Sequence, residues 1–230
     1  MKRFWKEVTV DGDGGSFAIL LDGRPVNTPM REQLAVPTEA LAEAVAEEWR
    51  AGDDVIDPRA MPLTGLANAA IDRVAADRAT FARGLARYGD SDLTCYRATG
   101  PQELVAVQEM AWDALLSWAR RRYDVDFATT QGVTAVAQPA GTVEQLSHAA
   151  EALDAFHLAG LSPIVTIGGS LVAALALLEK AITAGQAWDA VSIDERWQIE
   201  QWGVDAEAEQ AIENRHAAFM AGARFLELLG

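Results

Sequence analysis

Near the start of the chain, apolar and polar side chains alternate in short runs, and this period of two predicts β-strands. The first run covers residues 4–10. Turns are expected at residues 11–15 (DGDGG) and at Asp22-Gly23, because glycine adopts the backbone conformations that tight hairpins require. The two turns separate further extended segments, which we expect over residues 16–21 and 24–28.

After Thr38 the apolar spacing lengthens to three or four residues, which predicts amphipathic helices. Leu41, Val45 and Trp49 recur at four-residue intervals, and Thr38 is the expected N-cap of their helix. We interpret Trp49 as a core residue packed on the sheet, since a large aromatic side chain on an apolar face is usually buried. A second helix is expected over residues 63–87.

The rest of the chain follows helical spacing, apart from a polar break at residues 89–96 and an irregular stretch at residues 125–141. The irregular stretch is expected to be an extended arm or a short hairpin. Further helices are expected over residues 102–123, 142–158, 164–184 and 211–229. The order predicts an α+β protein, with a β-sheet plus helix domain at 1–87 and a predominantly α-helical domain at 88–230.

Some of these helices carry signals for their ends or their faces. Thr142 followed by Gln145 has the spacing of a capping box, and Gly185 is expected to end the apolar helix over residues 164–184. In the helix over residues 102–123, one apolar side includes Val107, Ala111, Leu115 and Trp118.

Residues 192–210 (SIDERWQIEQWGVDAEAEQ) form the most unusual segment. Ser192 followed by Glu195 predicts a capping box and therefore a helix start. Along that helix one apolar stripe includes Trp197 and another, nearly opposite, includes Trp202. Two opposed stripes suggest a helix held between other layers. Glu195 falls beside the second stripe, so we expect a partly covered carboxylate.

The charge of the chain excludes some partners. The sequence has 19 basic and 34 acidic residues, a formal net charge of −15. Binding to nucleic acid or to an anionic membrane surface needs lysine and arginine facing phosphate, so neither is expected. The apolar run at residues 161–178 contains proline, glycine and polar residues and is short for a membrane span, which favours a buried helix.

The cysteine content and the first residues indicate a compartment. Cys95 is the only cysteine, so no internal disulfide forms and a reducing compartment is expected. The sequence MKRFWKEVTV lacks the apolar stretch of a signal peptide and the composition of a transit peptide.

Sequence motifs for catalysis are absent. The three histidines do not have the spacing of a helical metal pair, and the chain has neither a P-loop nor a Gly-x-Ser-x-Gly elbow. We therefore expect no enzymatic activity, metal or cofactor. Asp90 and Asp92 form a carboxylate pair that suits acid–base chemistry, but helix capping is the favoured interpretation.

Two other functions stay open at this point. A small-molecule hydrolase or lyase using Asp90 and Asp92 would hold both carboxylates in one pocket with raised pKa values. An apolar-ligand-binding helical protein would enclose a cavity near Trp202. The acidic, tryptophan-bearing helical surface itself is typical of protein binding, where an aromatic anchor is surrounded by polar residues.

Several segments resemble the assembly chaperones that bind the alpha subunit of the catalytic head of the F-type ATP synthase (ATP12-type chaperones). They are RPVNTP (24–29), LAVPTEALAEAVAEEW (34–49), IDPRAMPLTGLANAAIDRV (56–74), YGDSDLTCYRA (88–98), the helix around 112–118, and DERWQIEQWGVDAEAE (194–209). The resemblance extends over nearly the whole chain.

The resemblance implies a non-enzymatic chaperone, with an α/β part followed by a helical domain. We expect it to be a monomer. Such a protein binds the unassembled alpha subunit and shields the surface that later faces the beta subunit. Family members in eukaryotes work in the mitochondrial matrix, and the start of this sequence fits a bacterial cytoplasm.

The resemblance also implies client-binding residues in the acidic tryptophan motif. Its functionally important acidic residue corresponds to Glu195 or to the neighbouring Asp194. The candidate partner-binding residues are Glu195, Asp194, Trp197, Gln198, Trp202, Asp205, Glu207, Asp90 and Asp92. A chaperone of this kind predicts an open groove or an exposed apolar patch with Glu195 at or near it.

Overall fold

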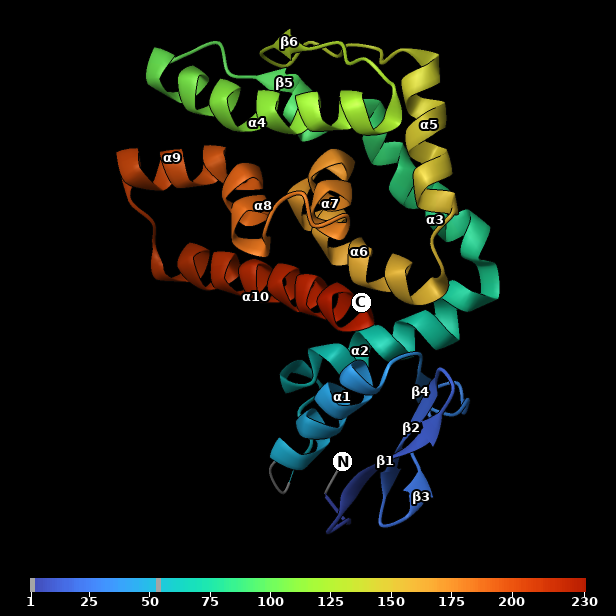
Figure 1. The fold of residues 1–230 in the computed structure, drawn as a ribbon. Coiled ribbons are helices and arrows are strands. Elements are labelled where there is room, and N and C mark those ends of the chain that lie inside the picture. Colours follow the sequence, from blue (N-terminus) through green and yellow to red (C-terminus); the bar gives the residue numbers. More distant parts are fainter. Residues whose placement is uncertain (1–2, 53–54) are drawn as a thin grey trace. The chain divides into compact units, whose positions relative to one another are not determined.

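The computed structural model describes residues 3–52 and 55–230, and Figure 1 shows the order of their helices and strands. The chain forms two compact units. The first combines the described part of Met1–Arg78 with Asp154–Gly160 and Arg224–Gly230. The second contains Ala79–Leu153 and Leu161–Ala223 and is built mainly of helices.

The first unit contains a small antiparallel sheet whose strands are β1 (Val8–Asp13), β2 (Ser16–Leu21), β3 (Arg24–Pro25) and β4 (Ala35–Val36). Strand β2 pairs with each of the other three, and Val8 lies opposite Leu21 in the β1–β2 hairpin. The predicted turn over residues 11–15 is wrong in its extent, because β1 continues to Asp13. Only Gly14 and Gly15 form the turn, and both have positive φ angles (56° and 98°).

Helix α1 (Glu39–Ala51) packs against this sheet. The Thr38 hydroxyl accepts a hydrogen bond from the Leu41 amide at 3.2 Å, which confirms the predicted cap. Trp49 is 9% exposed, and its ring lies 5.2 Å from that of Trp5. The predicted role of Trp49 as a core residue is therefore confirmed.

The predicted helix over residues 63–87 consists of consecutive helical segments. They are α2 (Pro62–Ala69), the π-helical turn η2 (Ala70–Val74), the 3-10 turn η3 (Ala75–Asp77) and α3 (Arg78–Ala86). Before them lies the 3-10 turn η1 (Pro58–Ala60). The Glu48 carboxylate accepts the amides of Leu63 and Thr64, each at 2.8 Å, and so satisfies two amides of the first turn of α2.

Residues far along the chain complete the core of the first unit. Phe225 is fully buried in the cluster that contains Trp5 and Trp49, and its ring stacks on that of Phe156 at 6.5 Å. Residues from the sheet, from α1 and from the distant Arg224–Gly230 segment thus share one hydrophobic core.

The second unit surrounds a short buried helix, α7 (Leu171–Leu178). Its other elements are the 3-10 turns η4 (Arg87–Ser91) and η5 (Leu93–Cys95), β5 (Tyr96–Arg97), α4 (Gln102–Tyr123), β6 (Thr130–Gln131), α5 (Ala140–Glu151), α6 (Ala155–Gly168), α8 (Ala184–Val191), α9 (Ile193–Trp202) and α10 (Ala206–Leu229). Figure 1 shows α7 and α8 between α4 and α10. Helices α6 and α10 each also supply residues to the first unit.

The predicted fold class is confirmed, but several predicted helix ends are wrong. The expected helix over residues 142–158 ends at Glu151, because the Asp154 carboxylate accepts the amides of Phe156 and His157 (both 2.9 Å) and starts α6. The expected capping box at Thr142 is absent, since its hydroxyl donates to the carbonyl of Asp126. Helix α5 begins earlier, at Ala140.

The expected apolar helix over residues 164–184 is also divided, between α6 and α7. Gly185 does not end a helix but lies in the first turn of α8. That helix starts at a capping box in which Thr183 and Gln186 exchange side-chain bonds with each other's amides. The apolar run at residues 161–178 is largely buried, as predicted. In the described part of the chain, no helix is long and apolar enough to cross a membrane.

The irregular stretch at residues 125–141 forms an extended arm. Its β6 pairs in parallel with β5, so the hairpin alternative is wrong. The Gln138 side chain exchanges two hydrogen bonds with the backbone of Ala128, at 3.0 and 2.8 Å, and holds the arm together.

Candidate functional site

The start of α9 differs from the prediction. Ser192 accepts no capping hydrogen bond, and its hydroxyl instead donates to the Trp188 carbonyl at 2.7 Å. The Arg196 amide bonds to the Ser192 carbonyl, so α8 continues into α9 almost without interruption. The predicted capping box between Ser192 and Glu195 is therefore wrong, because the last turn of α8 occupies the hydroxyl.

The Glu195 carboxylate is paired with a residue of the following helix. The Arg215 guanidinium on α10 donates to Glu195 Oε1 and ties α9 to α10. The Glu195 side chain is 31% exposed, so the expectation of a partly covered carboxylate is confirmed. The remaining exposed surface leaves room for a second contact.

Asp194 faces the other way and helps to fix α9 on α4. Gln108 Nε2 donates to Asp194 Oδ1 at 2.5 Å, while Gln108 Oε1 accepts the Ala98 amide at 2.7 Å. One turn further along α4, the Trp112 indole N–H donates to the carbonyl of Ala190 on α8, at 2.7 Å. These bonds position α8 and α9 along the same side of α4.

A buried cation supports this arrangement. Arg97 is 7% exposed and donates to the Gln108 carbonyl at 2.9 Å and to Asp113 at 2.6 Å. Its guanidinium lies 5.1 Å from the centre of the Trp112 ring, a distance suited to cation–π attraction. Each buried polar group named here therefore has a partner, which favours one fixed position of α4.

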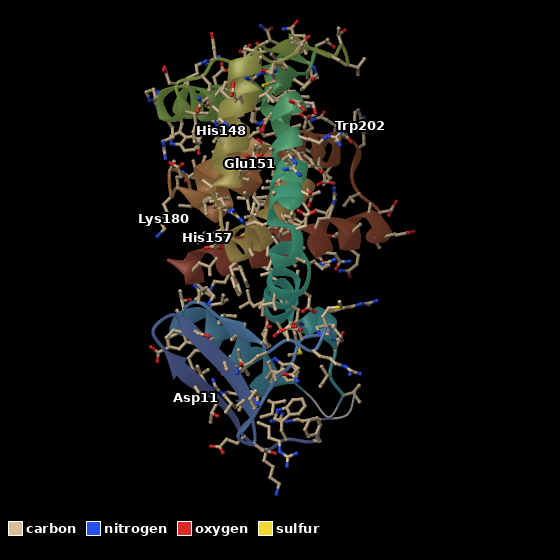
Figure 2. The ribbon with its side chains drawn as sticks, turned by 90° about the vertical axis from the view of Figure 1, so that its right-hand side faces the viewer. Asp11, His148, Glu151, His157, Lys180 and Trp202 are labelled. Atoms are coloured by element: carbon tan, nitrogen blue, oxygen red, sulfur yellow. The ribbon has the colours of Figure 1, made fainter. Side chains whose placement is uncertain are left out.

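The far end of α9 is exposed. The side chain of Trp202 is 79% exposed and stands at the edge of the helical unit (Figure 2). Neither a helix held between layers nor an enclosed cavity around Trp202 fits this exposure, so both expectations are wrong. Helix α9 contacts α4 and α8, but its buried residue, Ile193, lies at its beginning.

The predicted continuous helix over residues 192–210 is broken after Trp202. Gly203 has a φ angle of 75°, a conformation that favours glycine, and residues 203–205 separate the two helices. The Asp205 carboxylate then accepts the Ala208 amide at 2.8 Å and starts α10. Gly203 lay within a helical spacing of apolar residues, which hid its role as a helix end.

The structure gathers seven of the nine candidate residues on α9 and the start of α10. They are Asp194, Glu195, Trp197, Gln198, Trp202, Asp205 and Glu207. Gln198, Trp202, Asp205 and Glu207 are exposed, whereas Trp197 is half-buried. We call these exposed residues, together with Glu200, the Trp202 tip; it combines one large apolar side chain with three exposed carboxylates.

Asp92 is used for capping rather than for chemistry. It is fully buried and accepts hydrogen bonds from Thr94 (amide 3.0 Å, hydroxyl 2.7 Å), the Ser170 hydroxyl (2.7 Å) and the Val172 amide (2.9 Å). Burial raises the pKa of Asp92, and these hydrogen bonds act in the opposite direction. The carboxylate joins η5 to the start of α7.

Asp90, by contrast, is exposed. The two carboxylates do not share a pocket, which contradicts the hydrolase or lyase hypothesis and confirms the capping interpretation for Asp92. Among the residues that the structure describes, no group of His, Cys, Asp and Glu could hold a metal ion.

An apolar groove lies between α4 and the segment containing α8 and α9, with a volume of about 520 Å³. Its walls include Val107, Met110 and Trp118 of α4, and Ile182, Ile193 and Arg196 opposite. The apolar spacing predicts that Val107 and Trp118 share one side of their helix, but it does not predict a groove. The signal available was the width of that stripe, which extends to Met110, a side chain that is 76% exposed.

Comparisons with known proteins agree with one another. The family model described as ATP12 chaperone protein matches residues 2–120. The crystal structure of Atp12 from Paracoccus denitrificans is similar to this chain, with a TM-score of 0.93 and 43% identity, over 99% of this chain and 97% of that one.

Two further relatives extend the comparison. A solved protein from Agrobacterium tumefaciens is 38% identical, with a TM-score of 0.93, over all of this chain and 86% of its own. The mitochondrial protein atp12 of Schizosaccharomyces pombe is 24% identical over 214 residues, covering 88% of this chain and 74% of that protein.

Proposed function

Because the chain belongs to the ATP12 chaperone protein family, we propose that it acts in ATP synthase assembly by binding the free alpha subunit of the F-type enzyme. It is a chaperone and not an enzyme. On binding, it covers the surface of the alpha subunit that later faces the beta subunit, and it leaves when the ring forms. We place this activity in the bacterial cytoplasm.

One observation carries the choice of binding surface, namely the 79% exposure of Trp202. A buried tryptophan removes a large apolar area from water, and tryptophan is enriched among the residues that dominate binding energy at interfaces. Carboxylates of Glu200, Asp205 and Glu207 lie within five residues of it in the sequence and are exposed. They suit a partner surface with an apolar pocket and a basic rim.

The fixed position of α9 also supports the Trp202 tip as the binding surface. Asp194 bonds to Gln108 of α4, and Glu195 pairs with Arg215 of α10, so the helix is held from both sides. A rigid support reduces the entropy lost on binding. Within the motif, Asp194 and Glu195 thus position the helix, while Trp202 and its neighbours contact the client.

The chaperone must bind more weakly than the beta subunit does. A subunit interface is an apolar surface that associates non-specifically if it stays uncovered. A difference of a few kcal/mol is sufficient for displacement, since about 1.4 kcal/mol corresponds to a tenfold change in the binding constant.

Co-purification with the isolated alpha subunit tests the proposal. We expect the tagged protein to retain the alpha subunit and not the beta subunit, which serves as the matched control. Equal retention of both subunits, or of neither, would contradict the proposed client.

A charge exchange tests whether Glu195 positions α9, as proposed, or contacts the client directly. Glu195→Lys places a cation against Arg215, so it disturbs the α9–α10 contact as well as any client contact. The double variant Glu195→Lys/Arg215→Glu restores the ion pair with reversed charges. Recovery of alpha-subunit binding would assign Glu195 to positioning, whereas a persistent defect in a folded protein would assign it to client contact.

A further inference from the structure

The apolar groove of the helical unit runs along a defined direction. Gln108 of α4 bonds to Asp194, Trp112 bonds to Ala190, and Arg122 Nε bonds to Glu179 Oε2 at 2.5 Å. The residue numbers rise along α4 and fall along the opposite wall, so the two walls of the groove are antiparallel. Val107 lies at the end of the groove near Arg196, and Arg121 lies at the end near Ile182.

The length of the groove suits a helix. Val107, Met110, Ala114, Trp118 and Arg121 recur every three or four residues along α4, so their stripe follows the helix axis. At 1.5 Å per residue, the distance from the first to the last is about 21 Å. A compact small molecule needs no such length, whereas an amphipathic helix binds a groove through residues at this repeat.

The apolar side chains that α4 contributes to the groove wall are accessible to a partner. Met110 is 76% exposed and Val107 is 37% exposed, although both are large apolar residues on the groove wall. Methionine is flexible and polarisable and recurs at surfaces that bind helices of varied sequence. Its position beside Ala111 and Ala114 leaves space for an inserted side chain.

The two arginines of the groove differ in their partners. Arg196 donates to the Asp189 carboxylate and carbonyl, each at 3.0 Å. Arg121 forms no hydrogen bond or ion pair with any residue in the described part of the chain. In a protein of net charge −15, a guanidinium without a carboxylate partner at the end of an apolar groove favours a ligand that supplies one.

We propose that this groove binds an amphipathic helical segment of an unassembled protein, with an apolar face on Met110 and a carboxylate paired to Arg121. The inference rests on the proposed function in taking that segment to belong to the client. Helix α9 carries Ile193 and Arg196 on the groove wall and Trp202 at its exposed end, so the groove and the Trp202 tip belong to one helix.

Two synthetic helical peptides provide the probe. Both are hydrocarbon-stapled and fluorescein-labelled and have the same leucine-rich face, but one carries glutamate and the other lysine at the end that meets Arg121. Binding is measured by fluorescence anisotropy. We expect the wild-type protein to bind the glutamate peptide more tightly, by about threefold, as a partly exposed ion pair allows.

Substitutions in the groove test the contacts. Met110→Glu is expected to weaken both peptides by at least about tenfold, because it places a charge against the apolar face. Arg121→Glu is expected to reverse the preference between the two peptides. The matched controls are Met30→Glu, whose methionine is 69% exposed in the first unit, and Arg87→Glu, an exposed arginine of the helical unit. Both controls should bind as the wild type does.

Several outcomes would overturn the inference. The first is that neither peptide binds. The second is that Met110→Glu and Met30→Glu have equal effects on binding. The third is that Arg121→Glu has the same preference between the two peptides as the wild type. Sedimentation that detects a dimer dissociated by Met110→Glu would identify a second copy as the occupant. Binding of a fatty acid in place of the peptides would identify a small-molecule site.

The failure of the groove and that of the proposed client can be distinguished. If the wild type and Met110→Glu retain the alpha subunit equally, the groove is not used, and the assembly function is unaffected. If the wild type binds the peptides with the expected charge preference but does not retain the alpha subunit, the groove binds helices and the client is a different protein.

Discussion

Two tryptophans of the helical unit, Trp112 and Trp202, have opposite environments. Trp112 is fully buried, donates its indole N–H to Ala190 and lies beneath the Arg97 guanidinium. Trp202 is 79% exposed at the end of α9. The first joins α4 to α8, whereas the second contributes little to the core. The comparison shows that residue type alone does not separate a structural aromatic from a binding one.

The difference has an energetic meaning. Burial of apolar area contributes about 25 cal/mol per Å², and a tryptophan can bury 150–250 Å². Trp112 contributes this free energy to folding. For Trp202 the same contribution becomes available only when a partner covers it. The two sites should therefore respond differently to the same truncation.

Replacing Trp112 by alanine is expected to have the largest effect on stability. The cavity and the lost Ala190 bond should reduce the free energy of unfolding by about 3–5 kcal/mol. Trp202→Ala is the matched control and should change it by less than about 0.5 kcal/mol. Urea unfolding followed by circular dichroism measures both. Similar decreases in the free energy of unfolding of the two variants would contradict the structural role of Trp112 and the exposed role of Trp202.

The Asp92 cap should be the next most sensitive position. In Asp92→Ala, the donors of Thr94, Ser170 and Val172 lose their partner in the core, but the cost of burying a carboxylate is also removed, so we expect a net loss of about 1–3 kcal/mol. Asp90→Ala, an exposed neighbour, should leave the free energy of unfolding within about 0.5 kcal/mol of the wild type. An equally mild effect of Asp92→Ala would show that water replaces the carboxylate.

Trp202→Ala should act on binding and not on stability. Truncation of a central aromatic contact typically costs about 2 kcal/mol or more, so retention of the alpha subunit should fall by at least about tenfold. Biolayer interferometry with immobilised alpha subunit measures the change, and Met30→Ala is a control with similar exposure in the first unit. Unchanged affinity would move the client contact away from the Trp202 tip.

The smallest expected effect concerns Cys95, a buried residue of the helical unit. Burial raises the pKa of its thiol to about 12, so almost no thiolate forms at pH 8. We expect no reaction with a thiol reagent such as Ellman's reagent in the native protein, and full reaction in urea. Rapid labelling without denaturant would indicate local opening around η5.

Local patterns predicted much of the fold. The strand over residues 16–21 is predicted by the turns on either side of it, and the start of α1 by the Thr38 cap. Both depend on interactions within a few residues. The break at Asp154 also depended on a local cap, but the apolar spacing on either side of it resembled one helix.

The candidate site was harder to predict because its contacts are distant in sequence. Nothing near Glu195 indicates that Arg215 pairs with it, or that Gln108 holds Asp194. The capping box at Ser192 had the right spacing, but the Trp188 carbonyl competed for the hydroxyl. The groove likewise required the antiparallel approach of two walls, which no single helix encodes.

The position of Phe225 has a consequence for biosynthesis. Its ring belongs to the same core as Trp5 and Trp49, although the ribosome adds it long after them. Domains usually fold as units during synthesis, beginning from the N-terminal side. Here the sheet and α1 cannot complete their core until the Arg224–Gly230 segment has emerged. Maturation of the N-terminal strands is thus linked to the end of α10, and a nascent chain that stops before Phe225 leaves that core open.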